Sequence, residues 1–271
     1  MSRQSRSQIL ALIERHGLVP RKAYGQHFLA DPNLIDKVVA TAEVAEGDRV
    51  VEVGAGTGAL TSALAAAGAR VVAYEIDPRL RPILEEVLAD VDVDLRFADV
   101  MELDLTAELT GSPWKLVANL PYNVGTPLLL EVLLGADKIT SMTVMVQKEV
   151  ADRLVASPGS ADYGLPSVAV ALTARVVERF AVPPQVFVPP PQVASSVLRL
   201  DRSGDPPARL DEAMELARIA FGQRRKMLRR SLAGRVPEEV LEAAGIDPSQ
   251  RPEQVDPRQF VALAERMAAG A

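Results

Sequence analysis

The sequence predicts an α/β protein in which helices flank a mostly parallel sheet, followed by a small all-helical domain. Between Asp48 and Gln147, short apolar or β-branched segments alternate with segments of helical character, as expected for βαβ units. The first strand-like segment ends in alternating glycines at 54–58. After a linker-like stretch at 201–207, only helical patterns and turn signals remain. We therefore expect two domains, residues 1–202 and residues 203–271.

The individual elements follow from local patterns in chain order. An apolar-periodic segment at 7–17 predicts a first helix, and Asp31-Pro32 is typical of an N-cap followed by proline at the first position of a helix that runs to about Ala42. Strands are expected at 49–53, 70–75, 93–97, 114–118, 141–147, 167–174 and 194–200. Between them, helices are expected at 59–67, from Asp77-Pro78 onward, at 126–134 and at 148–156.

Composition excludes several kinds of protein. The 271 residues include no cysteine, which excludes disulfides and thiolate metal sites, and we expect no metal site. The polar N-terminus lacks the apolar core of a signal peptide, and no apolar run reaches the roughly 18–20 residues that span a bilayer, so a cytoplasmic protein without a membrane partner is expected.

The charge is unevenly distributed along the chain. The formal net charge is −6, yet residues 3–22 hold five basic residues and residues 221–235 hold six. A negative total argues against a surface that binds nucleic acid everywhere, since phosphate contacts require Lys and Arg. The two basic segments are either a confined track for nucleic acid or ordinary solvated helix faces.

Groups suited to a nucleoside follow three of the predicted strands. The glycines at 54–58 follow the first strand, Glu75 ends the second, and Asp99 follows the third. Because open parallel sheets bind ligands at the carboxyl ends of their strands, these groups are expected to meet. Glycines allow the backbone to approach a ligand. Glu75 is placed to accept hydrogen bonds from two ribose hydroxyls, and Asp99 to accept one from an adenine amine.

Two nucleotide ligands and a structural alternative compete for this pattern. A dinucleotide site requires G-x-G-x-x-G, whereas residues 54–58 read G-x-G-x-G, and Glu52 would face a pyrophosphate unfavourably. A cationic ligand without phosphate, such as S-adenosylmethionine, tolerates carboxylates. We therefore predict S-adenosylmethionine as the cofactor; the alternative is a plain strand–turn–helix with no ligand.

The fourth predicted strand ends in Asn119-Leu120-Pro121-Tyr122. This segment resembles the Asn-x-Pro-Tyr loop of methyltransferases that act on adenine N6 or cytosine N4. An aromatic exocyclic amine is a poor nucleophile because its lone pair is delocalised into the ring. Acceptors at the Asn119 side-chain oxygen and the Leu120 carbonyl localise that lone pair, Pro121 stiffens the loop, and Tyr122 offers a ring for stacking. The alternative is an ordinary turn with a core tyrosine.

Ordered motifs over nearly the whole chain resemble the KsgA/Dim1 family of ribosomal RNA adenine dimethyltransferases. They are Gly25-Gln26-His27-Phe28-Leu29, residues 51–58, Tyr74-Glu75-Ile76-Asp77, Asn119-Leu120-Pro121-Tyr122-Asn123, Gln147-Lys148-Glu149-Val150-Ala151, residues 187–197 and Phe221-Gly222-Gln223-Arg224-Arg225-Lys226. The resemblance implies a Rossmann-like class I methyltransferase fold. It also implies dimethylation of two adjacent adenosines in a hairpin loop near the 3′ end of small-subunit rRNA, and a role in small-subunit assembly.

The resemblance also implies roles for particular residues. Contacts to the cofactor are implied for His27, Leu29, Gly54, Gly56, Glu75, Asp99 and Asn119. The target amine and base would be held by Asn119, Leu120, Pro121 and Tyr122, with Phe187 stacking on the other face of the base. His27 departs from the family pattern, which often has Asn at this position, although either side chain can hydrogen-bond the cofactor or its neighbours.

The second basic segment then gains a role in RNA binding. Its cations are Arg224, Arg225, Lys226, Arg229 and Arg230. If residues 213–232 form one helix, Arg225 shares a face with Arg229, and Lys226 shares a face with Arg230. We expect this face to hold rRNA phosphates in a small-subunit precursor, with no DNA partner and with the protein a monomer.

Three other functions remain open from the sequence. The first is the related large-subunit rRNA methyltransferase that confers macrolide resistance, which shares the cofactor and amine motifs. The second is an RNA-binding assembly or transcription factor that kept the fold and lost the chemistry. The third is a DNA adenine methyltransferase, although the helical tail lacks an obvious sequence-reading module.

Overall fold

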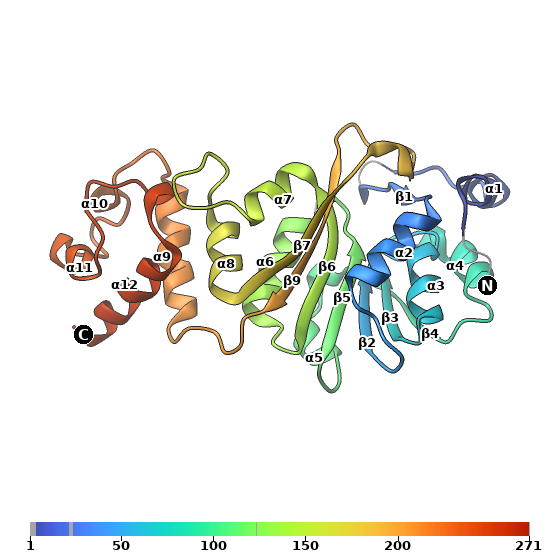
Figure 1. The fold of residues 1–271 in the computed structure, drawn as a ribbon, viewed down its shortest axis with the longest axis horizontal. Helices are drawn as coiled ribbons and strands as arrows, with labels where there is room; N and C mark the ends of the chain where they lie inside the picture. Colours follow the sequence, from blue (N-terminus) through green and yellow to red (C-terminus); the bar gives the residue numbers. More distant parts are fainter. Residues whose placement is uncertain (1–3, 22–23, 123, 271) are drawn as a thin grey trace. The chain divides into compact units, whose positions relative to one another are not determined.

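A computed structural model describes residues 4–21, 24–122 and 124–270, and its main feature is a seven-stranded sheet. The sheet has the order β4-β3-β2-β5-β6-β9-β7 (Figure 1). Its strands are β2 (Arg49–Val53), β3 (Arg70–Glu75), β4 (Val93–Phe97), β5 (Trp114–Asn119), β6 (Ile139–Gln147), β7 (Ala174–Val182) and β9 (Ser195–Arg202). Strands β4, β3, β2, β5 and β6 are parallel, whereas β9 runs antiparallel to β6. The expectation of a mostly parallel sheet is confirmed.

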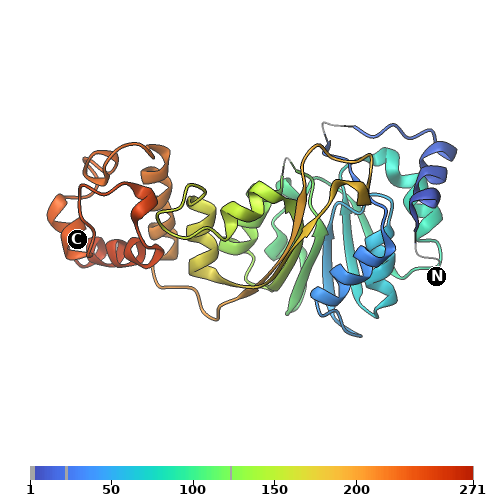
Figure 2. The same cartoon turned by 45° about the horizontal axis from the view of Figure 1, so that its top comes forward.

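The helices of the first part of the chain are α1 (Arg6–Arg15), α2 (Pro32–Thr41), α3 (Ala59–Ala66), α4 (Arg81–Val87), α5 (Leu105–Glu108), α6 (Gly125–Gly135) and α7 (Lys148–Leu154). Those that follow are α8 (Leu165–Thr173), α9 (Leu210–Gly222), α10 (Leu228–Ser231), α11 (Glu238–Ala243) and α12 (Pro257–Ala269). A short antiparallel pair joins β1 (Phe28–Leu29) to β8 (Phe187–Val188), which can be followed in Figure 2. Within the described residues, none of the helices is both long and apolar enough to span a bilayer.

Strand register brings the predicted site groups to one edge of the sheet. Val53 lies opposite Tyr74 on β3, and Glu75 lies opposite Phe97 on β4, so the three strands end together. Asn119 lies opposite Met145 at the same end of β5. The carboxyl ends of neighbouring parallel strands therefore form a single ligand-binding edge, as expected for this architecture.

Local sequence explains where α2 begins. The carboxylate of Asp31 accepts hydrogen bonds from the backbone N–H groups of Asn33 and Leu34, at 2.9 and 3.0 Å. Pro32 occupies the first helical position, where a missing N–H costs nothing. The predicted start of this helix is confirmed.

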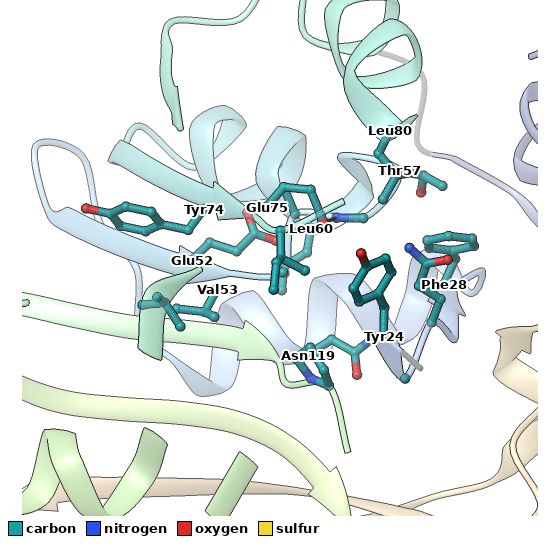
Figure 3. Close-up of a pocket in the computed structure, with 18 of the residues that line it drawn as sticks. Tyr24, Phe28, Glu52, Val53, Thr57, Leu60, Tyr74, Glu75, Leu80 and Asn119 are labelled. Atoms are coloured by element: carbon teal, nitrogen blue, oxygen red, sulfur yellow. Dashed lines mark hydrogen bonds between the residues drawn. The ribbon is translucent and has the colours of Figure 1, made fainter. Parts of the chain in front are cut away.

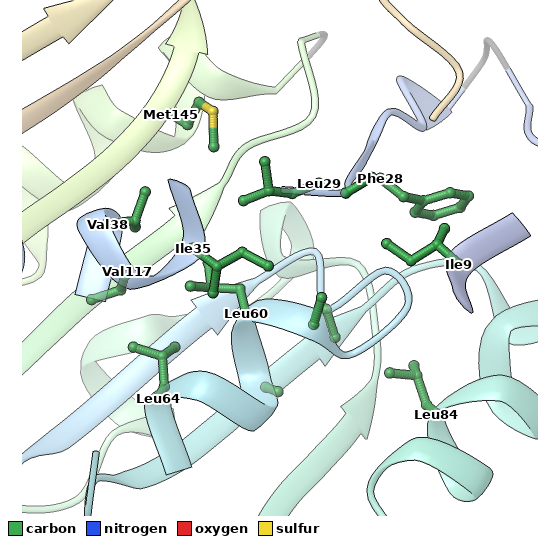
Figure 4. Packing of buried hydrophobic residues seen from close by; sticks show 14 of the residues in the cluster. Ile9, Phe28, Leu29, Ile35, Val38, Leu60, Leu64, Leu84, Val117 and Met145 are labelled. Carbon is green, nitrogen blue, oxygen red and sulfur yellow. The ribbon is translucent and has the colours of Figure 1, made fainter. Parts of the chain in front are cut away.

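The apolar faces of α2 and α3 form a core against the sheet. Ile35 and Val38 of α2 lie beside Leu60 and Leu64 of α3 (Figure 4), and all four side chains are buried. Val117 of β5 closes the cluster from the sheet. This packing holds α3, and with it the glycine turn that precedes α3, against the ligand-binding edge.

The predicted strand at 167–174 is wrong, because this segment is helix α8 and the strand begins only at Ala174. The apolar run that suggested a strand, Val168-Ala169-Val170-Ala171-Leu172, is buried almost throughout. A short, wholly buried apolar run has no periodicity that separates strand from helix. The helix start is set locally: Pro166 lies in its first turn, and Ser167 Oγ accepts from the Gly164 N–H at 3.1 Å.

The chain forms two compact units. One comprises residues 1–151 and 176–201, and the other comprises residues 152–175 and 202–271. The second unit contains the residues that follow the expected linker and also residues 152–175, which include α8; this helix packs on α9 and α12. The expected division at 202/203 therefore omits one helix of the C-terminal unit, because that helix is far from its packing partners in sequence. The continuous helix suggested at 213–232 is also wrong, since α9 ends at Gly222 and α10 begins at Leu228.

Candidate active site

A pocket opens at the carboxyl ends of β2, β3, β4 and β5 (Figure 3). All seven residues predicted to contact the cofactor line it: His27, Leu29, Gly54, Gly56, Glu75, Asp99 and Asn119. None of the described lining residues is Lys or Arg. The pocket therefore has the charge expected for a cationic ligand without phosphate.

The glycine turn needs glycine for conformation and for space. Gly54 and Gly56 have φ values of +84° and +58°, in the left-handed region that side chains disfavour. A Cβ atom on Gly56 would lie 3.2 Å from Cδ1 of Phe28, and one on Gly54 would lie 3.5 Å from Cδ of Pro121. The turn thus keeps its backbone close to both the N-terminal motif and the Asn119 loop.

Glu75 joins the glycine turn to the end of β3. Its Oε2 accepts from the Gly56 N–H and its Oε1 from the Asp77 N–H, both at 2.9 Å. Burial is the main cause of a raised pKa for the Glu75 carboxyl, and the two backbone donors oppose that rise. Each oxygen keeps a further lone pair, so the carboxylate suits a pair of hydroxyl donors such as those of a ribose.

Asp99 lies half-buried at the end of β4. Its Oδ1 accepts from the Met101 N–H at 2.9 Å and so caps the short 3-10 turn Val100–Glu102. No donor among the described residues reaches Oδ2, which is free to accept from an adenine amine at the pocket wall.

Glu52 is the most unusual charge of the pocket. It belongs to β2, is 1% exposed, and its Oε2 lacks a hydrogen-bond partner. Burial, with a smaller contribution from the nearby Glu75 carboxylate, raises the pKa of Glu52 to about 8. Figure 3 shows the two carboxylates on the same side of the pocket. A cationic ligand group would offset the cost of ionising this buried carboxyl, so the residues present fit S-adenosylmethionine, which carries an ammonium and a sulfonium.

The amide of Asn119 has a fixed orientation. Its Nδ2 donates to the backbone carbonyl of His27 at 3.1 Å. No donor among the described residues reaches its Oδ1, so the oxygen is available to a ligand amine. The sequence alone does not reveal this bond, since its two residues are far apart in the chain.

Tyr122 is held by two neighbours. Its hydroxyl lies 2.7 Å from Oγ of Ser195, and its ring centroid lies 5.4 Å from that of His27. Burial raises the pKa of the Tyr122 hydroxyl. His27 is in turn fixed by a 2.8 Å hydrogen bond between Nδ1 and the Pro189 carbonyl. Asn123, the last residue of this predicted motif, lies outside the described residues.

Phe187 differs from the sequence-based interpretation. It pairs with Leu29 in the β1–β8 sheet, is fully buried, and belongs to the same hydrophobic core as α2 and α3. Because its ring has no exposed face in this conformation, it is not presented to a base. The stacking role assigned to Phe187 stays a prediction that requires the loop to move.

Several pocket residues were missed by sequence reasoning. Tyr24, Gln26 and Thr57 line the pocket although no separate role was assigned to them. Gln26 donates to Asp77 at 2.7 Å, and Thr57 exchanges two hydrogen bonds with the buried side chain of Gln4, at 2.8 and 2.9 Å. Gln26 belongs to the Gly25–Leu29 motif, whereas the sequence carries no signal for Gln4.

Comparisons with known proteins agree with this geometry. The sequence profile described as ribosomal RNA adenine dimethylase matches residues 18–269. The chain belongs to this family. It is 47% identical over 268 residues to "Ribosomal RNA small subunit methyltransferase A" of Phenylobacterium zucineum, covering 98% of this chain and 94% of that protein. It is 40% identical to the protein of the same name from Laribacter hongkongensis, covering 94% and 97%.

Solved structures support the class I methyltransferase fold of this dimethylase-family chain. A dimethyladenosine transferase from Plasmodium falciparum aligns with a TM-score of 0.75 at 24% identity, covering 88% of this chain and 96% of that one. The 23S rRNA methyltransferase ErmE aligns with a TM-score of 0.66 at 28% identity, covering 89% and 99%. Both alignments extend well beyond the pocket.

The cations predicted to bind RNA do not lie on one continuous helix. Arg225, Lys226, Arg229 and Arg230 are exposed, but they are divided between α10 and the turn that precedes it. Arg224 instead donates to Glu253 at 2.8 Å and to the Ala161 carbonyl at 2.7 Å, so it also holds the C-terminal unit together. The helical break separates the expected i, i+4 pairs, because those pairs assumed one continuous helix.

Proposed function

We propose that this chain transfers methyl groups from S-adenosylmethionine to the N6 amines of two adjacent adenosines, in a hairpin loop near the 3′ end of small-subunit rRNA. Membership of the ribosomal RNA adenine dimethylase family supports the reaction. The small-subunit methyltransferase A proteins, at 40–47% identity, support the small-subunit substrate over the large-subunit one. An intact amine-binding loop speaks against a binding-only factor, and the ribosomal RNA names of the family and its members favour an RNA substrate over DNA.

Different pocket residues would contact different parts of the cofactor. Glu75 would accept from the ribose hydroxyls, Asp99 from the adenine amine, and Glu52 would face the ammonium end. His27, Leu29, Gly54 and Gly56 would shape the wall around them. The bound cofactor supplies a methyl group on a good sulfonium leaving group, and the protein supplies position and polarity.

The observation that carries the proposal is the orientation of Asn119. Because its Nδ2 is committed to the His27 carbonyl, its Oδ1 must be the atom presented to an amine. An acceptor at that position, together with the Leu120 carbonyl, draws the amine hydrogens and localises the nitrogen lone pair toward the cofactor. The amine proton becomes acidic once the nitrogen carries four substituents, so no dedicated general base is required.

The rest of the surface is assigned to the substrate. Tyr122 provides a ring on which an extruded adenine can stack, a contact typically worth about 1–3 kcal/mol. The exposed cations Arg225, Lys226, Arg229 and Arg230 would hold rRNA phosphates without reading sequence. We propose a small-subunit precursor as the partner, a monomeric enzyme, a cytoplasmic location and a role in small-subunit assembly.

Replacing Asn119 by Ala tests the proposal. We expect methyl transfer to small subunits from a strain lacking the modification to fall at least about 100-fold, while cofactor binding falls less. Wild-type protein must modify these subunits and leave unmodified large-subunit rRNA unlabelled. Turnover of Asn119→Ala within a few-fold of wild type would refute the role of Asn119, whereas labelling of large-subunit rRNA alone would refute the assigned substrate.

A further inference from the structure

A buried serine contacts the only tyrosine of the amine-binding loop. Ser195 is the first residue of β9, lies opposite Gln147 of β6, and has no exposed surface. Its Oγ lies 2.7 Å from the Tyr122 hydroxyl. The two residues are separated by 73 positions in sequence, so the sheet and not the loop sets this contact.

The position of Ser195 makes it a rigid anchor. A strand inside the sheet has little freedom, because β9 is bonded to β6 on one side and to β7 on the other. Tyr122 belongs to a connection between β5 and α6, which has more freedom than the strand. The hydrogen bond therefore transfers the rigidity of the sheet to the tyrosine ring.

A second neighbour restrains the same ring. The His27 ring packs on Tyr122 at 5.4 Å between centroids and 31° between planes, and His27 is itself bonded to the Pro189 carbonyl. The His27 contact limits tilting of the tyrosine ring, whereas the Ser195 bond limits movement of its hydroxyl end. Together the two contacts restrain the ring at its face and at its hydroxyl end.

We propose that Ser195 is a positioning residue for methyl transfer, holding the Tyr122 ring where it aligns an extruded adenine with the Asn119 oxygen. The inference rests on the proposed function of the Asn119–Tyr122 loop and adds to it a residue outside that loop. Ser195 acts through Tyr122 and does not itself touch the adenine. Loss of the bond would lower the fraction of bound adenine in reacting geometry, so it would lower kcat more than affinity.

A double-mutant cycle tests this inference. Ser195→Ala and Tyr122→Phe each remove one partner of the bond and keep the aromatic ring. We expect each variant to lower kcat about 10-fold on unmodified small subunits, with KM for subunits and cofactor within about two-fold of wild type. The double variant should lose no more than either single variant, because both remove the same bond.

Matched controls separate positioning from stability. Ser196 is the next residue of β9, is 2% exposed, and points to the opposite face of the sheet, so Ser196→Ala should leave kcat unchanged. Ser195→Thr keeps the hydroxyl and should recover most of the lost rate. If Ser195→Ala unfolds, Tyr122→Phe still tests the bond from its other partner.

The outcomes are distinguishable from failure of the proposed function. If wild-type protein methylates no subunit, the proposed function fails before the serine is tested. If wild type is active but the two single losses multiply in the double variant, Ser195 does not act through Tyr122. An equal loss of kcat in Ser196→Ala, or a loss confined to KM, would also overturn the positioning role.

Discussion

Glu52→Gln should make the folded protein more stable at alkaline pH. Glu52 is 1% exposed on β2 and its Oε2 has no hydrogen-bond partner, so ionisation leaves a charge in an apolar environment. Burial raises the pKa of this carboxyl to about 8 from an ordinary value of 4.5. Glutamine has nearly the same shape and no charge at any pH, so the substitution removes the ionisation and keeps the packing.

The size and sign of the effect follow from proton linkage. Between pH 4.5 and about 8 the folded state binds more protons at Glu52 than the unfolded state does. The free energy of unfolding therefore falls as pH rises through this window, and the contribution of protonated Glu52 is fully present only below pH 4.5. At about 1.4 kcal/mol per pH unit, the interval from 4.5 to about 8 corresponds to about 5 kcal/mol.

Urea unfolding from pH 5 to pH 9, followed by tryptophan fluorescence, measures this difference. The single tryptophan, Trp114, is 5% exposed at the start of β5 beside β2, so its emission reports unfolding of the sheet that carries Glu52. The stability of Glu52→Gln relative to wild type should grow by several kcal/mol between pH 5 and pH 9. Glu46→Gln, a change at an exposed glutamate just before β2, should show no such trend. Parallel pH profiles for Glu52→Gln and wild type would refute the argument.

Three further predictions concern other parts of the molecule. Gly56→Ala should weaken S-adenosylmethionine binding, measured by calorimetry, at least about 10-fold, because the new Cβ would lie 3.2 Å from the Phe28 ring. Gly17→Ala is the control: Gly17 has the same φ of +58° but nothing within 4 Å of its Cβ position. It should cost only about 1–2 kcal/mol of backbone strain and leave binding intact. Reversing Arg225 and Arg229 to Glu should weaken subunit binding and reduce the slope of log affinity against log salt by about 2, and unchanged affinity at low salt would remove them from the RNA track. Arg224→Ala should lower the thermal stability of the protein as well as RNA binding, since Arg224 pairs with an acid inside its own unit; an effect on binding alone would show that the pairing is not structural.

Much of the catalytic unit could be predicted from local sequence. The strands β2 to β6 have β-branched or apolar residues between clear turn signals. Asp31-Pro32 marks the start of α2 by itself, with Asp31 as the N-cap and Pro32 as the first helical residue. Because the carboxyl ends of parallel strands meet at one edge of a sheet, the sequence predicts that residues at strand ends lie close together. The pocket is indeed lined by four of them, Gly54, Glu75, Asp99 and Asn119. These groups act where the chain leaves a strand, so their positions depend on local patterns.

Local sequence was insufficient wherever burial or a distant partner decides structure. The apolar run at 168–172 forms a helix that packs against α9 and α12, which lie far along the chain, and these partners are not visible in the local sequence. The basic run does not form one helix, since α9 ends at Gly222 and α10 begins only at Leu228. Between them, Arg224 donates a hydrogen bond to Glu253, 29 residues further along the chain. Phe187 is a core residue because its strand, β8, pairs with β1. The residues next to Phe187 in the sequence do not reveal this pairing.

By itself, the sequence determined the fold class, the family and the groups that meet at the end of the sheet, since each depends on residue types at short spacing. Only the tertiary structure decided which atoms those groups present. The bond from Asn119 to the His27 carbonyl selects the oxygen for the amine, and the bond from Tyr122 to Ser195 orients the ring. Both bonds join segments more than 70 residues apart, and only folding brings such donors and acceptors within 3.1 Å.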